Sequence, residues 1–147
     1  MMTKVDFYIL PNSTIEQRHL FACRLVEKAY KLGHQIYIHS DDEAQTNALD
    51  QLLWSWRNSS FIPHQVEQTT IDNHERVQVG YNTANGSAAN HNDLMINVSN
   101  AVPEFFSRFE RVAEIVIQKP SVTDSTRANY RFYRDRGYPL KTHDLRK

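Results

Sequence analysis

Short runs rich in β-branched and aromatic residues alternate along this chain with longer segments in which apolar residues recur at helical spacing. The strand-like runs are residues 5–10, 35–40, 77–82, 93–99 and 113–118. The helix-like segments cover about 13–33, 40–57, a short stretch that starts at Pro103, and 121–136. Parallel strands need a crossover, which is usually a helix, so this order predicts an α/β fold. We expect a single domain with a largely parallel central sheet and helices on both faces.

Capping signals indicate where the first two long helices begin and where the first one ends. Ser13 is followed by Glu16, and Ser40 by Glu43, which is the spacing of a capping box. Gly33 follows the first helical stripe, at the position where glycine commonly closes a helix.

Composition limits the class of protein. The 147 residues are 40% hydrophobic, which supplies one good core, so we expect residues 1–147 to form one domain. No apolar run approaches the length of a membrane span, so we expect a cytoplasmic protein without membrane contact. The single cysteine, Cys23, is expected to be buried. The formal net charge is zero, but from residue 117 onward eight Lys or Arg residues stand against three Asp or Glu.

Common catalytic and nucleotide-binding motifs are missing from the sequence. The four glycines form no phosphate loop, and the seven histidines include no helical pair with a glutamate between them. We therefore expect no cofactor and no metal site. His39, Ser40, Asp41 and Asp42 end a predicted strand, where parallel sheets often carry active sites. A helix cap with acids in its first turn explains the same residues, and this structural interpretation is favoured over an enzyme.

An unusual tryptophan lies on the second predicted helix. The expected core stripe of this helix consists of Ala44, Ala48, Leu49, Leu52 and Trp56. Trp54 falls nearly opposite that stripe, among polar neighbours, and the following loop carries Phe61 and Ile62. Either the loop folds back over the indole ring, or Trp54, Phe61 and Ile62 form an exposed apolar patch that binds another protein.

The last predicted helix carries a cationic stripe. Arg127, Tyr130, Arg131 and Arg134 follow the i, i+3, i+4, i+7 rule and share one face. The nearest acids, Asp124 and Asp135, are expected to lie to the sides or ends of the stripe and to leave it without neutralising partners. A solvated surface helix is the ordinary interpretation of such a run. Uncompensated like charges cost stability, however, which favours a ligand-binding face.

Four segments of the chain together resemble a known family. VDFYIL at the start, ALDQLLWSW and SSFIPH in the middle, and RANYRFYRDRGYPL at the end are similar, in order and spacing, to the chi subunit of bacterial DNA polymerase III. The most specific parts are the tryptophan followed seven residues later by F-I-P-H, and R-x-x-Y-R-x-Y-R near the C-terminus. The resemblance covers essentially the whole chain and is weakest over residues 66–92.

The resemblance implies a function without catalysis. Chi subunits have an α/β fold and no known catalytic activity, and they bind the psi subunit of the clamp loader. They also bind the acidic C-terminal tail of the single-stranded DNA-binding protein, which ends in a phenylalanine with a free carboxylate. In some bacteria a helicase-like repair protein uses the psi-binding surface.

The resemblance also assigns residues. Trp54 and Phe61 match psi-binding positions, and Ile62 belongs to the same predicted patch. The candidate residues for binding the tail are Val116, Arg127, Tyr130, Arg131 and Arg134. A family lysine corresponds to Thr123 here, so the tail pocket loses a cation, for which Arg134 or Lys119 is the candidate replacement.

The competing hypothesis from another class is direct binding of single-stranded nucleic acid. In that case the arginines of the stripe would contact phosphates and Tyr130 would stack on a base. Overall neutrality and the small basic area argue against it, because non-specific binding normally needs many phosphate contacts.

Overall fold

The structure is a computed structural model that describes residues 3–55, 65–66, 77–81 and 93–146. Its elements, in chain order, are β1 (Lys4–Ile9), α1 (Ile15–Lys31), β2 (Ile36–His39), α2 (Glu43–Ser55), β3 (Gln65–Val66), β4 (Val77–Gly80), β5 (Leu94–Asn97), the 3₁₀ helix η3 (Glu104–Arg108), β6 (Arg111–Val116), α3 (Pro120–Asp135) and β7 (Leu140–Asp144). The predicted order of strands and helices is confirmed, and β3 and β7 are additions to it.

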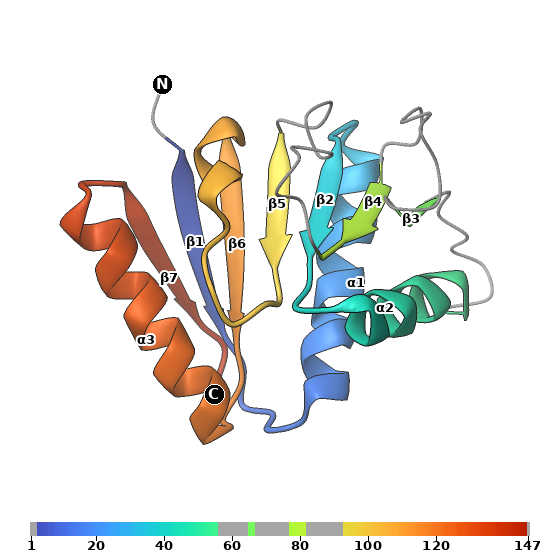
Figure 1. Ribbon diagram of the computed structural model, residues 1–147, viewed down its shortest axis with the longest axis horizontal. Coiled ribbons are helices and arrows are strands. Elements are labelled where there is room, and N and C mark those ends of the chain that lie inside the picture. The colour runs from blue at the N-terminus through green and yellow to red at the C-terminus, as the bar shows by residue number, and fades with distance from the viewer. Residues whose placement is uncertain (1–2, 56–64, 67–76, 82–92, 147) are drawn as a thin grey trace.

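The described strands form one parallel sheet in the order β3-β4-β2-β5-β6-β1-β7 (Figure 1). The first and last strands of the chain, β1 and β7, are therefore neighbours. Each connection between parallel strands must return to the opposite end of the sheet, and α1 and α3 make this return beside the sheet. The α/β fold predicted from the sequence is confirmed.

Two apolar clusters cover the two faces of the sheet. One joins α1 and α2 to the sheet through residues such as Val26, Leu53 and Ile115. The other joins α3 and η3 to the sheet through residues such as Tyr133 and Phe106. Alternate residues of β6 enter different clusters because successive side chains of a strand point to opposite faces. Helices therefore lie on both faces, as predicted.

The helix boundaries differ slightly from the capping signals. The cap of α1 is Thr14, whose hydroxyl accepts a hydrogen bond from the backbone N–H of Gln17 at 3.2 Å, so Ser13 is not the cap. Asp42 receives the N–H of Gln45 at 2.8 Å at the start of α2, in place of the predicted Ser40. In each helix the capping side chain lies one or two residues after the predicted serine, and it accepts a hydrogen bond from a backbone N–H of the first turn. Gly33 follows α1 with a φ of 88°, a left-handed conformation that favours glycine.

Cys23 is fully buried, as predicted, in the apolar cluster that joins α1 and α2 to the sheet. Burial raises the pKa of its thiol to about 12. None of the described helices is long and apolar enough to cross a membrane.

Candidate functional site

A pocket of about 310 Å³ lies between α3 and the strands β1, β6 and β7. We call it the α3 pocket. Its floor consists of Phe7 and Ile9 from β1 and Val116 from β6. Two side chains of the predicted stripe, Arg127 and Tyr130, line it from the helix. The pocket exists because α3 is anchored by its other side, which leaves this flank of the helix open above the strands.

The buried side of α3 follows helical spacing through Val122, Thr126, Asn129 and Tyr133. The hydroxyl of Tyr133 donates a 2.7 Å hydrogen bond to Glu114 on β6, and the side-chain amide of Asn129 lies 3.5 Å from the same carboxylate. These contacts fix the rotation of α3 about its axis. The rotation in turn decides which stripe residues reach the pocket.

Glu114 is a fully buried carboxylate at the centre of this anchor. Asn97 donates a 2.8 Å hydrogen bond to it from β5, in addition to the bond from Tyr133. Burial raises the pKa of Glu114, opposed by the hydrogen bonds from Asn97 and Tyr133 and by the charge of Arg18. From the sequence, Glu114 is predicted to lie in a strand and has no predicted role. The signal that could have found it is a single acid within an otherwise apolar strand.

Tyr130 forms the aromatic wall of the α3 pocket. Its side chain is 37% exposed, and its ring centroid lies 5.2 Å from that of Phe7 in a tilted arrangement. One side of the ring is thus held by the sheet while the other remains accessible. A flat ring beside an apolar floor is a suitable surface for another aromatic or aliphatic side chain.

Two arginines supply the positive charge of the α3 pocket. Arg127 comes from α3, and Arg146 comes from the chain that follows β7. Arg127 is 3.9 Å from Asp124, but both side chains are about three-quarters exposed (74% and 76%), so this ion pair contributes little. Arg146 donates from Nε and Nη2 to the two carboxylate oxygens of Asp144, at 2.9 and 2.7 Å. Sequence analysis missed Arg146 because it lies beyond an unpredicted strand.

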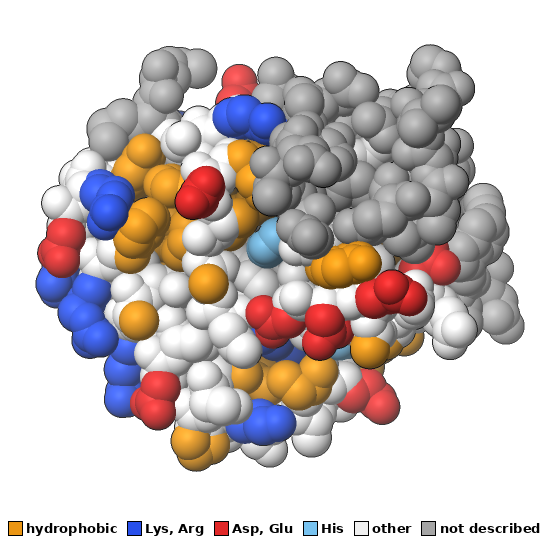
Figure 2. All heavy atoms as spheres, viewed as in Figure 1, with side chains coloured by type: hydrophobic (Ala, Val, Ile, Leu, Met, Phe, Trp, Pro, Cys, Tyr) orange, Lys and Arg blue, Asp and Glu red, His pale blue; other side chains and the backbone are white. Residues whose placement is uncertain are grey.

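The other two arginines of the predicted stripe do not line the α3 pocket. Arg131 is turned about 100° around the helix axis from Tyr130, toward solvent. Arg134 lies about one turn beyond Tyr130, past the end of the pocket, and contacts Asp135 at 3.2 Å. The acids at the ends of the stripe therefore do form ion pairs with it, contrary to the expectation of an uncompensated face. Lys/Arg side chains gather on the left of Figure 2, the side on which α3 and β7 lie in Figure 1.

The residues of the possible enzyme site are used for structure. His39 is buried with its Nδ1 atom 3.2 Å from the hydroxyl of Tyr37, and burial lowers its pKa to about 4. Ser40 contacts the hydroxyl of Thr46 and the carbonyl of Gly80. Asp41 accepts the backbone N–H of Asn100 at 2.9 Å. Among the residues that the structure describes, no group of three or more His, Cys, Asp or Glu side chains could hold a metal ion.

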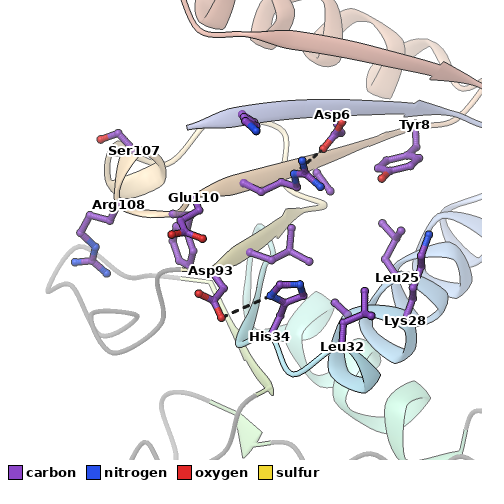
Figure 3. Close-up of a pocket in the computed structure, with 16 residues that line it drawn as sticks. Asp6, Tyr8, Leu25, Lys28, Leu32, His34, Asp93, Ser107, Arg108 and Glu110 are labelled. Atoms are coloured by element: carbon purple, nitrogen blue, oxygen red, sulfur yellow. Dashed lines mark ion pairs between the residues drawn. The ribbon is translucent and has the colours of Figure 1, made fainter. Parts of the chain in front are cut away.

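A larger pocket of about 400 Å³ lies between the end of α1 and the amino ends of β1, β5 and β6 (Figure 3). Two ion pairs lie along it, since Asp6 is 3.4 Å from Arg111 and His34 is 3.9 Å from Asp93. None of the residues predicted to form a site belongs to this pocket.

The predicted apolar patch lies outside the described part of the chain. Trp54 is in the last turn of α2, but its side chain is not described, and neither are Phe61 and Ile62. The patch therefore remains a prediction.

Comparison with known proteins identifies the family. Residues 2–141 match the sequence model of the family described as DNA polymerase III chi subunit, HolC. This chain belongs to the DNA polymerase III chi subunit family. It is similar to the DNA polymerase III subunit chi of Pseudomonas aeruginosa, with 44% identity over 144 residues that cover 98% of each chain. The chi subunit of Escherichia coli is 26% identical over 148 residues, covering 96% of this chain and 97% of the relative. The chi subunit of Haemophilus influenzae is 23% identical over 145 residues, covering 99% of both.

The resemblance seen in the sequence is thereby confirmed. The matched region of the chi family includes Trp54, Phe61 and every predicted residue of the stripe. Arg146 lies after its last matched residue, so the family match says nothing about the part of the α3 pocket that this arginine forms.

Proposed function

We propose that this protein is a non-catalytic accessory subunit of the clamp-loader complex of DNA polymerase III, acting in the cytoplasm. In this proposal the α3 pocket binds the acidic C-terminal tail of the single-stranded DNA-binding protein, and a second surface binds the psi subunit. The protein thus connects the polymerase complex to coated single-stranded DNA. Membership of the chi family supports the first part of the proposal.

The observation that carries the tail-binding role is that Val116, Arg127 and Tyr130 line one pocket. A C-terminal phenylalanine presents a benzyl ring and a carboxylate side by side. The ring would rest on Val116 against the face of Tyr130, and the carboxylate would accept hydrogen bonds from Arg127. Arginine suits this ligand because its planar fork matches a carboxylate with two parallel hydrogen bonds.

The contact is expected to be weak and sensitive to salt. A charge-assisted hydrogen bond contributes about 1.5–3 kcal/mol where it is partly desolvated. The tail, however, gives up conformational freedom when it binds, and Arg127 is well exposed, so salt screens its charge. We expect a dissociation constant in the micromolar range that rises with salt concentration. A weak contact of this kind allows the tail to exchange.

The first prediction is that the free carboxylate of the tail is required. A labelled acidic peptide ending in phenylalanine should bind in a fluorescence-anisotropy titration, and its C-terminal amide should bind roughly tenfold more weakly, because one charged partner of Arg127 is lost. Bare single-stranded DNA of similar charge should hardly bind. If DNA binds as well as the free-acid peptide, phosphate recognition replaces tail binding as the function of this face.

The psi-binding surface is assigned to Trp54, Phe61 and Ile62. The support for this assignment is the sequence pattern, in which Trp54 among polar neighbours is followed by Phe61 and Ile62, together with the family membership. Exposed tryptophans and phenylalanines with polar neighbours are typical centres of protein interfaces. A helicase-like repair protein would compete for the same patch.

The second prediction separates the two surfaces. Replacing Trp54 or Phe61 with alanine should abolish binding of the psi subunit, because a large aromatic anchor is lost, and should leave the affinity for the acidic peptide unchanged. Isothermal titration calorimetry measures both affinities. A loss of both activities together with a lower melting temperature would show instead that these side chains belong to the core.

A further inference from the structure

The α3 pocket has an aromatic end and an open end. At the aromatic end, the ring of Tyr130 lies against Phe7. Two residues further along β1, Ile9 pairs with Val116 on one side and with Asp144 on the other. The pocket therefore extends along the strand direction, from Phe7 toward the carboxyl ends of β6, β1 and β7.

The two arginines occupy successive places along this direction. Helix α3 connects the carboxyl end of β6 to the amino end of β7, so it runs antiparallel to the strands. Arg127 precedes Tyr130 by about one helical turn and thus lies nearer the open end. Arg146 follows Asp144 by two residues and lies past the end of β7, at the open end itself. Thr123 lines the same part of the pocket from the first turn of α3.

Arg146 is held in a defined orientation. Its Nε and Nη2 atoms donate hydrogen bonds to the two carboxylate oxygens of Asp144. A guanidinium carries five N–H donors, so the donors on Nη1 and the second one on Nη2 are left over from this pair. Because Asp144 already restricts the side chain, less conformational entropy is lost when a ligand binds it than for an unrestrained arginine.

We propose that Arg146 is a second carboxylate-binding residue of the α3 pocket, which binds an acidic side chain that precedes the C-terminal phenylalanine of the ligand. This inference rests on the proposed tail-binding function. With the phenylalanine ring at the aromatic end and its terminal carboxylate on Arg127, the preceding residues leave the pocket through the open end. At the open end they pass Arg146. This arginine provides a positive charge in the part of the pocket where Thr123 is uncharged.

A double-mutant cycle tests the assignment. Three peptides are titrated by fluorescence anisotropy: an acidic peptide ending in free phenylalanine, its C-terminal amide, and a free-acid peptide whose two acids before phenylalanine are replaced by asparagine. Arg146→Ala should weaken the first peptide roughly two- to fivefold, as expected for a half-exposed charge pair. It should bind the asparagine peptide as wild type does, and it should still prefer the free acid over the amide. The Arg127→Ala variant should bind the free-acid peptide and its amide with similar affinity.

Arg24→Ala is the control, because it removes the same charge from an exposed position of α1, away from the α3 pocket. It should leave all three affinities within about 1.5-fold of wild type. If Arg24→Ala weakens binding as much as Arg146→Ala, general attraction explains the effect and the inference fails. If Arg127→Ala weakens the free-acid peptide and Arg146→Ala does not, the inference fails while tail binding stands. If wild-type protein does not distinguish the free acid from the amide, tail binding fails, and the inference with it.

Discussion

Glu114 shows how one residue can control a surface to which it does not belong. It is buried beneath α3, and its carboxylate accepts hydrogen bonds from Tyr133 and Asn97. An unsatisfied buried carboxyl group is costly, so these donors are needed to hold Glu114 in the strand. Since Tyr133 is less than one turn from Tyr130, the bond that stabilises Glu114 also places the aromatic wall of the α3 pocket.

The third prediction concerns this bond. Tyr133→Phe should lower the free energy of unfolding by about 1–3 kcal/mol in urea denaturation at pH 7, because Glu114 loses its 2.7 Å donor. The loss should shrink when Glu114→Gln is introduced as well, since the carboxyl group that accepts this hydrogen bond is then absent. Tyr138→Phe is the control, because the ring of Tyr138 packs on Phe106 and no hydrogen bond of its hydroxyl is among the described contacts. Equal losses for Tyr133→Phe in both backgrounds would contradict the coupling.

Sequence patterns predicted α3 well and did not predict β7. The apolar and aromatic positions of α3 recur with the helix period, so its existence and the shared face of Arg127 and Tyr130 could be predicted. Strand β7 has the sequence LKTHD, with one apolar residue and no alternation, because it is an edge strand with mostly exposed side chains. Its position follows from pairing with β1, at the other end of the chain.

The difference between a local pattern and a long-range contact also explains which parts of the α3 pocket the sequence did not predict. A stripe on one helix is a local property, so it could be found by spacing alone. Which flank of that stripe meets the sheet depends on the anchor at Glu114, and this contact joins residues far apart in the chain. The sequence therefore suggested Arg131 and Arg134 alongside Arg127, whereas the structure places Arg146 in the pocket instead of those two.

Several ionisable groups are buried where helices meet the sheet. Arg18 on α1 is 2% exposed and donates hydrogen bonds of 2.9 Å to the carbonyls of Ile115 and Val98. Burial lowers the pKa of His19 to about 4, with the positive charge of Arg18 acting in the same direction. Burial alone has the same effect on His39. Both histidines are therefore neutral in the folded protein near pH 7.

The fourth prediction is a loss of stability in mild acid. The unfolded chain binds protons on these histidines below pH 6.5, whereas the folded protein resists protonation until about pH 4. The contribution of the two neutral histidines to the free energy of unfolding is thus complete above pH 6.5. It falls as the pH drops toward 4, by up to about 3 kcal/mol for each histidine. His39→Gln should flatten this dependence in urea denaturation at a series of pH values. An unchanged slope for His39→Gln would contradict this assignment.

The parallel sheet separates the two helices to which binding surfaces are assigned. Helix α3 packs against β6, and α2 packs against β3 and β4, with β2 and β5 between them in the sheet. Tension between partners held at α2 and α3 would pass through the ladder of backbone hydrogen bonds that joins these strands. If the proposed micromolar contact forms at α3, it would break before that ladder does, and the subunit would stay folded when its partners separate.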